Sequence, residues 1–218
     1  MSAFYTDGQR AAQEQFETTK MADLLEQVIV HPEVQDAERA FIESRDMFFL
    51  ATVDDRGQPT CSYKGGDPGF VKVITPRTLL FPVYDGNGMY LSLGNIATSA
   101  RVGMLFIDFE TPHRLRVQGI ASVERDAALL RKYPGAEAVV RVAVSEIFVN
   151  CSRYVHRYQR VAASRYVPRA GCETPFAEWK RIDVVQGALP PNDAGRTERA
   201  GGTITIEEYE ARLAAGQA

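Results

Sequence analysis

The sequence is poor in the residues that build cross-links and metal centres. Its three cysteines are Cys61, Cys151 and Cys172, and its three histidines are His31, His113 and His156. The cysteines are too few and too far apart for a disulfide framework or a C-x-x-C metal site. The histidines lack the i, i+4 pairing that holds zinc on a helix. We therefore expect no metal site.

The sequence also lacks a large net charge and any long apolar run. A net charge of -3 gives no electrostatic reason to expect nucleic acid or an anionic membrane as a partner. No run of about 18 apolar residues occurs, and the first residues show no basic region followed by an apolar core. We expect neither a signal peptide nor a membrane span, and a cytoplasmic protein.

Two common phosphate-binding motifs are missing. The glycines spell neither G-x-G-x-x-G between a strand and a helix nor G-x-x-x-x-G-K-[ST], which excludes Rossmann and P-loop sites. Asp54-Asp55 is typical of a turn rather than of a catalytic carboxylate pair. No catalytic residue can be named from the sequence.

The stretch from Asp54 to Asp108 contains most of the candidate binding residues. Before it, 48–53 is rich in β-forming residues, and after the turn at 54–57 a second such run returns over 58–64, which predicts a hairpin. The return strand ends in Lys64-Gly65-Gly66. A cation at a strand end, next to backbone without side chains, suits close approach of a phosphate or a flat ring.

Further strands and helices follow from the same patterns. Strands are expected at 78–83, 101–108, 114–123 with a bulge near Gly119, and 138–150, with Ser92–Asn95 in a turn region. Helices are expected at 8–30, 33–45, 126–132 and, after a capping box at Thr205, up to about 214, with loop over 187–203. Short connections between these strands favour an antiparallel barrel over a parallel sheet.

The expected fold is mainly β, an antiparallel split β-barrel with flanking helices (α+β). The N-terminal helices would occupy 1–46, the barrel 47–150, and a helical or loop extension of the same domain 151–218. The segment after Ser152 is rich in arginine and tyrosine. It is interpreted either as a partly exposed helix with solvated arginines or as a cover over a cofactor site.

Four sequence blocks, in register, resemble one known family. They are F-L-A-T-V-D-x-x-G-x-P, S-Y-K-G-G-x-P-G-F-V, G-N-I-A-T-S-A-R-V-G-M-L-F-I-D and L-R-V-Q-G-I-A, within residues 36–150. Together they resemble the FMN-binding split barrels of the pyridoxamine 5'-phosphate oxidase-like superfamily, in its branch of probable FMN-dependent enzymes. The resemblance implies FMN as the cofactor.

The resemblance also implies candidate FMN-binding residues. They are Ser62, Tyr63, Lys64 and Gly65 near the ring and ribityl chain, Ser92, Asn95, Ser99 and Arg101 near the phosphate, and Arg114, Arg116 and Gln118 on a neighbouring strand. Other interpretations stay open: Lys64 could be a surface lysine, Arg101 could cap the preceding turn, and Asn95 could be the N-cap of a short helical turn.

In this superfamily the flavin usually lies between two subunits, so the resemblance implies a homodimer with the cofactor site at the interface. Residues from Arg153 to Trp179 could complete the partner's site, although for Trp179 a place in the core is the favoured interpretation. Pyridoxamine-phosphate oxidases proper finish with an Arg-x-His segment that grips the vitamer. This sequence has Glu210–Ala218 there instead.

The function expected from these observations is an FMN-binding flavoprotein, an oxidoreductase acting on a small organic substrate. The alternative is a protein that binds or scavenges haem or the deazaflavin F420 with the same barrel. A third hypothesis is a barrel that has lost its ligand and serves only in assembly.

Overall fold

The computed structural model describes residues 4–217 and divides into two compact units, Met1–Ala163 and Ser164–Ala218. The boundary falls within the segment expected to extend the barrel. The division into 1–46, 47–150 and 151–218 stays a prediction. Each unit is described below by itself.

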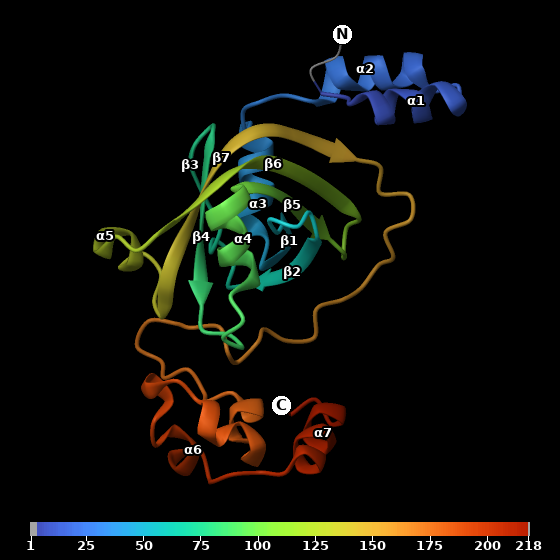
Figure 1. Ribbon diagram of the computed structural model, residues 1–218. Helices are drawn as coiled ribbons and strands as arrows, with labels where there is room; N and C mark the ends of the chain where they lie inside the picture. Colours follow the sequence, from blue (N-terminus) through green and yellow to red (C-terminus); the bar gives the residue numbers. More distant parts are fainter. Residues whose placement is uncertain (1–3, 218) are drawn as a thin grey trace. The chain divides into compact units, whose positions relative to one another are not determined.

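The first unit is built on one seven-stranded antiparallel sheet (Figure 1). Its strands are β1 (Met47–Val53), β2 (Pro59–Gly65), β3 (Lys72–Thr75), β4 (Thr78–Tyr84), β5 (Arg101–Asp108), β6 (His113–Glu124) and β7 (Ala136–Asn150). They lie in the order β2-β1-β5-β6-β7-β4-β3. The sheet curls without closing, and β2 and β3 are its edges. The split-barrel prediction is confirmed.

Alternation of apolar and polar residues decides which face of the sheet is inside. In β6, Leu115 and Val117 are fully buried, while Arg116 and Gln118 between and beyond them are exposed. Their cross-strand neighbours follow the same alternation, because paired residues of an antiparallel sheet share a face. Phe48, Phe81 and Phe106 meet in the enclosed core, with ring centroids about 5 Å apart.

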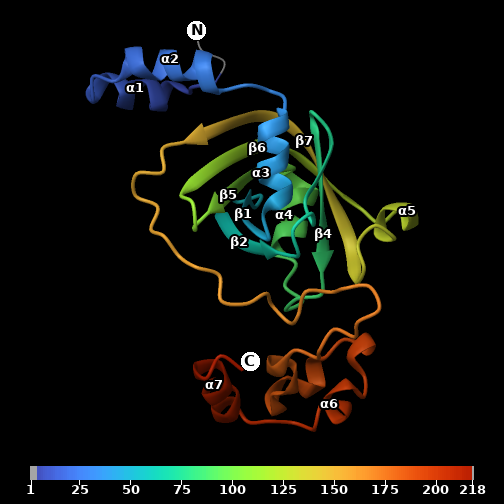
Figure 2. The same cartoon turned by 180° about the vertical axis from the view of Figure 1, so that it is seen from behind.

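Two helices lie against the sheet on different sides, α4 nearer the viewer in Figure 1 and α3 nearer in Figure 2. Helix α3 (Asp36–Ser44) starts with a capping box between Gln35 and Glu38 and buries Ile42 completely. Helix α4 (Leu91–Ser99) corrects the expectation of a turn at Ser92–Asn95. Left-handed residues at Tyr90 and Ala100 bracket this helix, and burial of Ile96 stabilises it.

The N-terminal segment is a helical hairpin rather than the single helix expected over 8–30. Helix α1 (Asp7–Gln15) and helix α2 (Thr19–Ile29) are separated by a turn in which Glu17 has a φ of 55°. Helices cannot continue through a left-handed residue, so the chain reverses there. The apolar stripe of α2 was predicted correctly, but the turn that separates α2 from α1 was not.

The short helix after β6 is α5 (Ala127–Leu130), capped by the Asp126 carboxylate. From Cys151 to Ala177 the described chain forms neither helix nor strand, so the helical interpretation of the arginine-rich segment is wrong. Tyr158 of this segment packs edge-on against Phe109, with ring centroids 5.5 Å apart.

The second unit is a small α-helical module held by a buried ion pair. It contains η1 (Glu178–Arg181), η2 (Asp183–Ala188), η3 (Pro191–Asp193), α6 (Arg196–Arg199) and α7 (Ile206–Ala214). Lys180 Nζ lies 2.8 Å from Asp193 Oδ2, and both side chains are 4% exposed. The capping box at Thr205 is confirmed. The expected loop over 187–203 is interrupted by η3 and α6.

The expected bulge near Gly119 is present, as the pairing of β6 with β7 shifts register between Gln118 and Gly119. A Cβ atom at Gly119 would lie 2.4 Å from the backbone oxygen of Ala143. Glycine is needed at this position because the partner backbone approaches too closely for any side chain.

We predict that Gly119→Ala lowers the free energy of unfolding by about 1–3 kcal/mol, the usual range for overpacking. Urea unfolding followed by circular dichroism would measure the change. The control is Gly103→Ala, whose added Cβ would lie 3.8 Å from that of Ala51, an ordinary contact. Equal stability of both variants would contradict this role of Gly119.

Candidate functional site

One cavity of ≈ 460 Å³ opens between the end of β2, the second half of β4 and helix α4. Ligand sites of proteins usually have volumes of about 300–1,000 Å³. Apolar side chains of the barrel core form its inner wall, and polar groups gather at the β2 side. The lining residues include Leu50, Phe81, Val83, Ile96, Val140, Ser62, Tyr63, Lys64, Gly65 and Ser92.

Five of the eleven sequence-predicted residues meet at this cavity: Ser62, Tyr63, Lys64, Gly65 and Ser92. The first four are consecutive on β2, and Ser92 comes from the first turn of α4. The Ser62 and Ser92 hydroxyl oxygens lie 3.1 Å apart and share one hydrogen bond. Because a hydroxyl can donate one bond and accept two, the pair keeps hydrogen-bonding capacity for a ligand.

Asn95 lies behind the hydroxyl pair and fixes α4 to the sheet. Its side-chain nitrogen donates to the hydroxyls of Thr52, at 3.0 Å, and Thr60, at 3.3 Å, and these two hydroxyls are 2.9 Å apart. Thr52 is 2% exposed and Asn95 8% exposed. This network therefore positions Ser92 opposite Ser62. Asn95 is a mid-helix residue rather than the N-cap.

Lys64 brings an uncompensated positive charge to the cavity. Within residues 4–217 its ammonium group has no hydrogen-bond or ion-pair partner. Burial lowers the pKa of Lys64, because a charged amine is less stable away from water. An anionic ligand would remove this penalty, so the site favours a negatively charged group beside Lys64.

The loop from Tyr84 to Leu91 forms the outer wall of the cavity. Tyr90, in the left-handed conformation, donates its hydroxyl hydrogen to Glu137 Oε2 at 2.8 Å. The hydrogen bond to Glu137 raises the pKa of Tyr90. This wall was not predicted from the sequence, although Asp85-Gly86-Asn87-Gly88 is a clear loop signal after a strand.

The other predicted residues lie outside the cavity. Ser99 ends α4 and Arg101 begins β5 with an exposed side chain. Arg114, Arg116 and Gln118 share the outer face of β6. Arg114 Nε is buried there without a hydrogen-bond partner in the described chain. Their roles in binding stay predictions.

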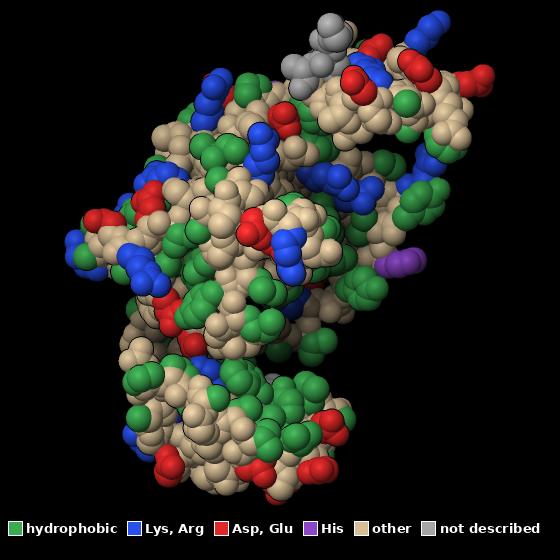
Figure 3. Space-filling model, viewed as in Figure 1, with side chains coloured by type: hydrophobic (Ala, Val, Ile, Leu, Met, Phe, Trp, Pro, Cys, Tyr) green, Lys and Arg blue, Asp and Glu red, His purple; other side chains and the backbone are tan. Residues whose placement is uncertain are grey.

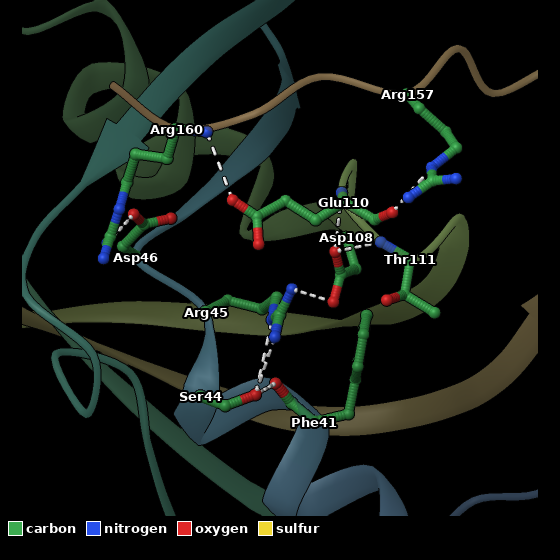
Figure 4. Close-up of polar contacts among 9 residues, drawn as sticks. All are labelled: Phe41, Ser44, Arg45, Asp46, Asp108, Glu110, Thr111, Arg157 and Arg160. Atoms are coloured by element: carbon green, nitrogen blue, oxygen red, sulfur yellow. Dashed lines mark hydrogen bonds and ion pairs between the residues drawn. The ribbon is translucent and has the colours of Figure 1, made fainter. Parts of the chain in front are cut away.

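The arginine-rich segment contacts Asp46, just before β1, and Glu110 in the β5–β6 turn (Figure 4). Arg160 Nη1 lies 2.7 Å from Asp46 Oδ2, and Arg157 Nε donates to the Glu110 carbonyl oxygen at 3.0 Å. The Asp46 charge also raises the pKa of Tyr63, after the larger effect of burial. These arginines therefore bind carboxylates and carbonyls of their own chain.

Other classes of site find no support. Among residues 4–217, no group of three or more His, Cys, Asp or Glu side chains could hold a metal ion. No helix in this part of the chain is long and apolar enough to cross a membrane. The three cysteines are unpaired and exposed.

The pyridoxamine 5'-phosphate oxidase family has a sequence pattern that matches residues 34–164, well over half of the chain. No curated protein matches this sequence. Similar solved structures include HupZ of Group A Streptococcus (19% identity, 57% of this chain and 99% of that one, TM-score 0.44). Another is an FMN-binding protein of Syntrophomonas wolfei (11% identity, 65% and 96%, TM-score 0.42). A third is an F420 reductase (19% identity, 52% and 98%, TM-score 0.41).

We predict that Asn95→Ala lowers the free energy of unfolding by about 1–3 kcal/mol, because it removes the amide that donates hydrogen bonds to the Thr52 and Thr60 hydroxyls in a buried network. Thermal and urea unfolding would measure the loss. Thr98→Ala, which removes a hydroxyl from the exposed side of the same helix, is the matched control. A loss as small as that of the control would show that the network does not hold α4.

Proposed function

Because the chain belongs to the pyridoxamine 5'-phosphate oxidase family, we propose that it is a flavoprotein that binds FMN at the Lys64 cavity. We further propose that it is an oxidoreductase acting on a small organic substrate. The observation that carries this proposal is the half-buried ammonium of Lys64, which has no ion-pair partner within residues 4–217 and lines the same cavity as the Ser62 and Ser92 hydroxyls. A dianionic phosphate would neutralise the charge that burial penalises.

The residues present fit the chemical parts of FMN. Lys64, Ser62 and Ser92 offer a cation and hydroxyls, which are the groups that bind phosphate and ribityl oxygens. Leu50, Phe81 and Ile96 form an apolar wall suited to a flat ring. When bound, the flavin would supply the hydride or electron transfer, and the protein would bind it, orient the substrate and exclude water.

We also propose a homodimer in which the outer face of β6 takes part in the partner's cofactor site. Arg114, Arg116 and Gln118 lie on that face, away from their own cavity, and Arg114 Nε has no hydrogen-bond partner among residues 4–217. Because buried polar groups are normally hydrogen-bonded, a group from a second subunit would satisfy it. Arg116 of one subunit is thus expected to contact the FMN bound in the cavity of the other subunit.

Haem is less well supported than FMN as the ligand, since none of the residues that line the cavity is a histidine. His156 is exposed and lies in the segment after β7. A deazaflavin carries a similar phosphorylated chain, so Lys64 alone does not distinguish it from FMN. The two are separated by the spectrum and mass of the bound molecule.

The first test is the absorbance spectrum of the purified protein, before and after adding FMN. Bands near ~450 and ~370 nm, with FMN identified by mass after heat release, are the expected result for a flavoprotein. A colourless protein that also refuses added FMN would overturn the proposal. A different released mass would assign the cavity to that ligand instead.

We predict that Lys64→Ala and Arg116→Ala each weaken FMN binding by at least about 1.5 kcal/mol, the low end for hydrogen bonds to charged groups. The reasons differ, because Lys64 lies in the cavity and Arg116 would reach it only from a partner subunit. Fluorescence titration of FMN measures both, with the exposed Lys132→Ala as control. If Lys64→Ala binds FMN as tightly as the wild type, the site assignment fails. If only Arg116→Ala binds FMN as tightly as the wild type, Arg116 does not contact the FMN of a partner subunit.

A further inference from the structure

The N-terminal hairpin presents an apolar surface to solvent. This hairpin face consists of five large side chains that are 40–73% exposed: Phe16, Met21, Leu24, Leu25 and Val28. Four of them recur at helical spacing on α2, of which only Ala22 is buried. Such a stripe on a soluble protein normally packs against another element. Nothing in residues 4–217 of the same chain covers it.

Polar contacts join the two helices of the hairpin, so the exposure of its apolar side chains is not a sign of a poorly formed segment. Arg10 on α1 lies 2.7 Å from Asp23 and 3.4 Å from Glu26 on α2. Tyr5 donates its hydroxyl hydrogen to the Ala22 carbonyl oxygen at 3.2 Å, and a capping box starts α1. The polar contacts thus join the two helices and leave the apolar stripe outside.

The hairpin is acidic. Between residues 4 and 30 five carboxylates stand against two basic side chains. Several of these carboxylates cover the hairpin at the top of Figure 3. A binding partner for the hairpin face should therefore combine apolar side chains with positive charge. A second hairpin would supply the apolar part but would add like charge.

The segment 151–163, called here the strap, has the complementary composition. It contains three arginines and no acidic residue. Its side chains Tyr154 and Val161 are 81% and 99% exposed. Within the described chain Arg153 forms no ion pair. The strap thus offers exposed apolar groups next to cations.

The strap is already fixed to its own barrel. Tyr158 N–H donates to the Phe109 carbonyl oxygen at 3.1 Å, and Arg160 N–H donates to Glu110 Oε1 at 3.2 Å. Together with the Arg160–Asp46 pair, these contacts hold the strap along the β5–β6 turn (Figure 4). These contacts leave the side chains of Tyr154 and Val161 exposed, so both are available to a second chain.

We propose that the hairpin face of one chain binds the strap of a second copy of this chain. Tyr154 and Val161 would cover the apolar stripe, and Arg153 would face the carboxylates around it. Two-fold symmetry would form the contact twice in each pair of chains. This surface is separate from the Lys64 cavity, and the proposal does not depend on the identity of the cofactor.

Sedimentation equilibrium of the full chain tests the proposal with two paired variants. The hairpin variant is Leu24→Ser with Val28→Ser, and the strap variant is Tyr154→Ser with Val161→Ser. Each removes two exposed apolar side chains and changes no charge. Each should raise the Kd of self-association by at least about tenfold, as loss of central interface side chains does. The control, Val184→Ser, removes a 71% exposed apolar side chain from the other unit.

A mixture of the hairpin and strap variants gives the sharper result. A mixed pair retains one intact contact, between the unaltered strap of the first chain and the unaltered hairpin of the second. It should therefore associate more tightly than either variant alone. If only the hairpin variant weakens association, the contact is hairpin to hairpin and the proposal is overturned. It is also overturned if neither variant changes the Kd, or if the wild type remains monomeric. Flavin content, read by absorbance in the same samples, reports separately on the cofactor.

Discussion

The seven strands must enclose an apolar core although their sheet does not close into a barrel. Its two edges lie at β2 and β3, and β3 is so short that it pairs with β4 only up to Leu80. The second half of β4 is therefore free on that side. Backbone and core side chains at such an opening must be covered. Helix α4 covers them only in part, and the cavity is the space that remains.

The incomplete closure of the sheet explains why the cavity has one apolar wall and one polar side. Its inner wall consists of side chains of the apolar core, such as Leu50 and Phe81. Its polar side comes from the inward positions of β2, where Ser62 and Lys64 occupy places that an apolar residue would fill in a closed barrel. The same alternation that builds the core thus orients the binding groups.

The sequence predicted much of this arrangement and missed the rest for identifiable reasons. Strand periodicity is a local signal, so β5 was located at its observed bounds and the bulge at Gly119 was expected. Helix α4 was missed, because Ser92, Gly94 and Asn95 favour turns. The interactions that stabilise the helix are long-range, namely burial of Ile96 in the core and the hydrogen bonds of Asn95 to Thr52 and Thr60. The division of the candidate residues between the cavity and the outer face of β6 depends on register and curvature, which no single segment encodes.

The state of Lys64 has a consequence for how the empty protein reacts. An amine whose pKa is lowered by burial is unprotonated for a larger fraction of the time at neutral pH than a lysine in water. The unprotonated form is the nucleophile that attacks aldehydes and activated esters. A bound anion would reverse this shift, so reaction of Lys64 with a small amine-directed reagent should slow when an anion occupies the cavity. The reactivity of Lys64 would therefore report whether an anion occupies the cavity.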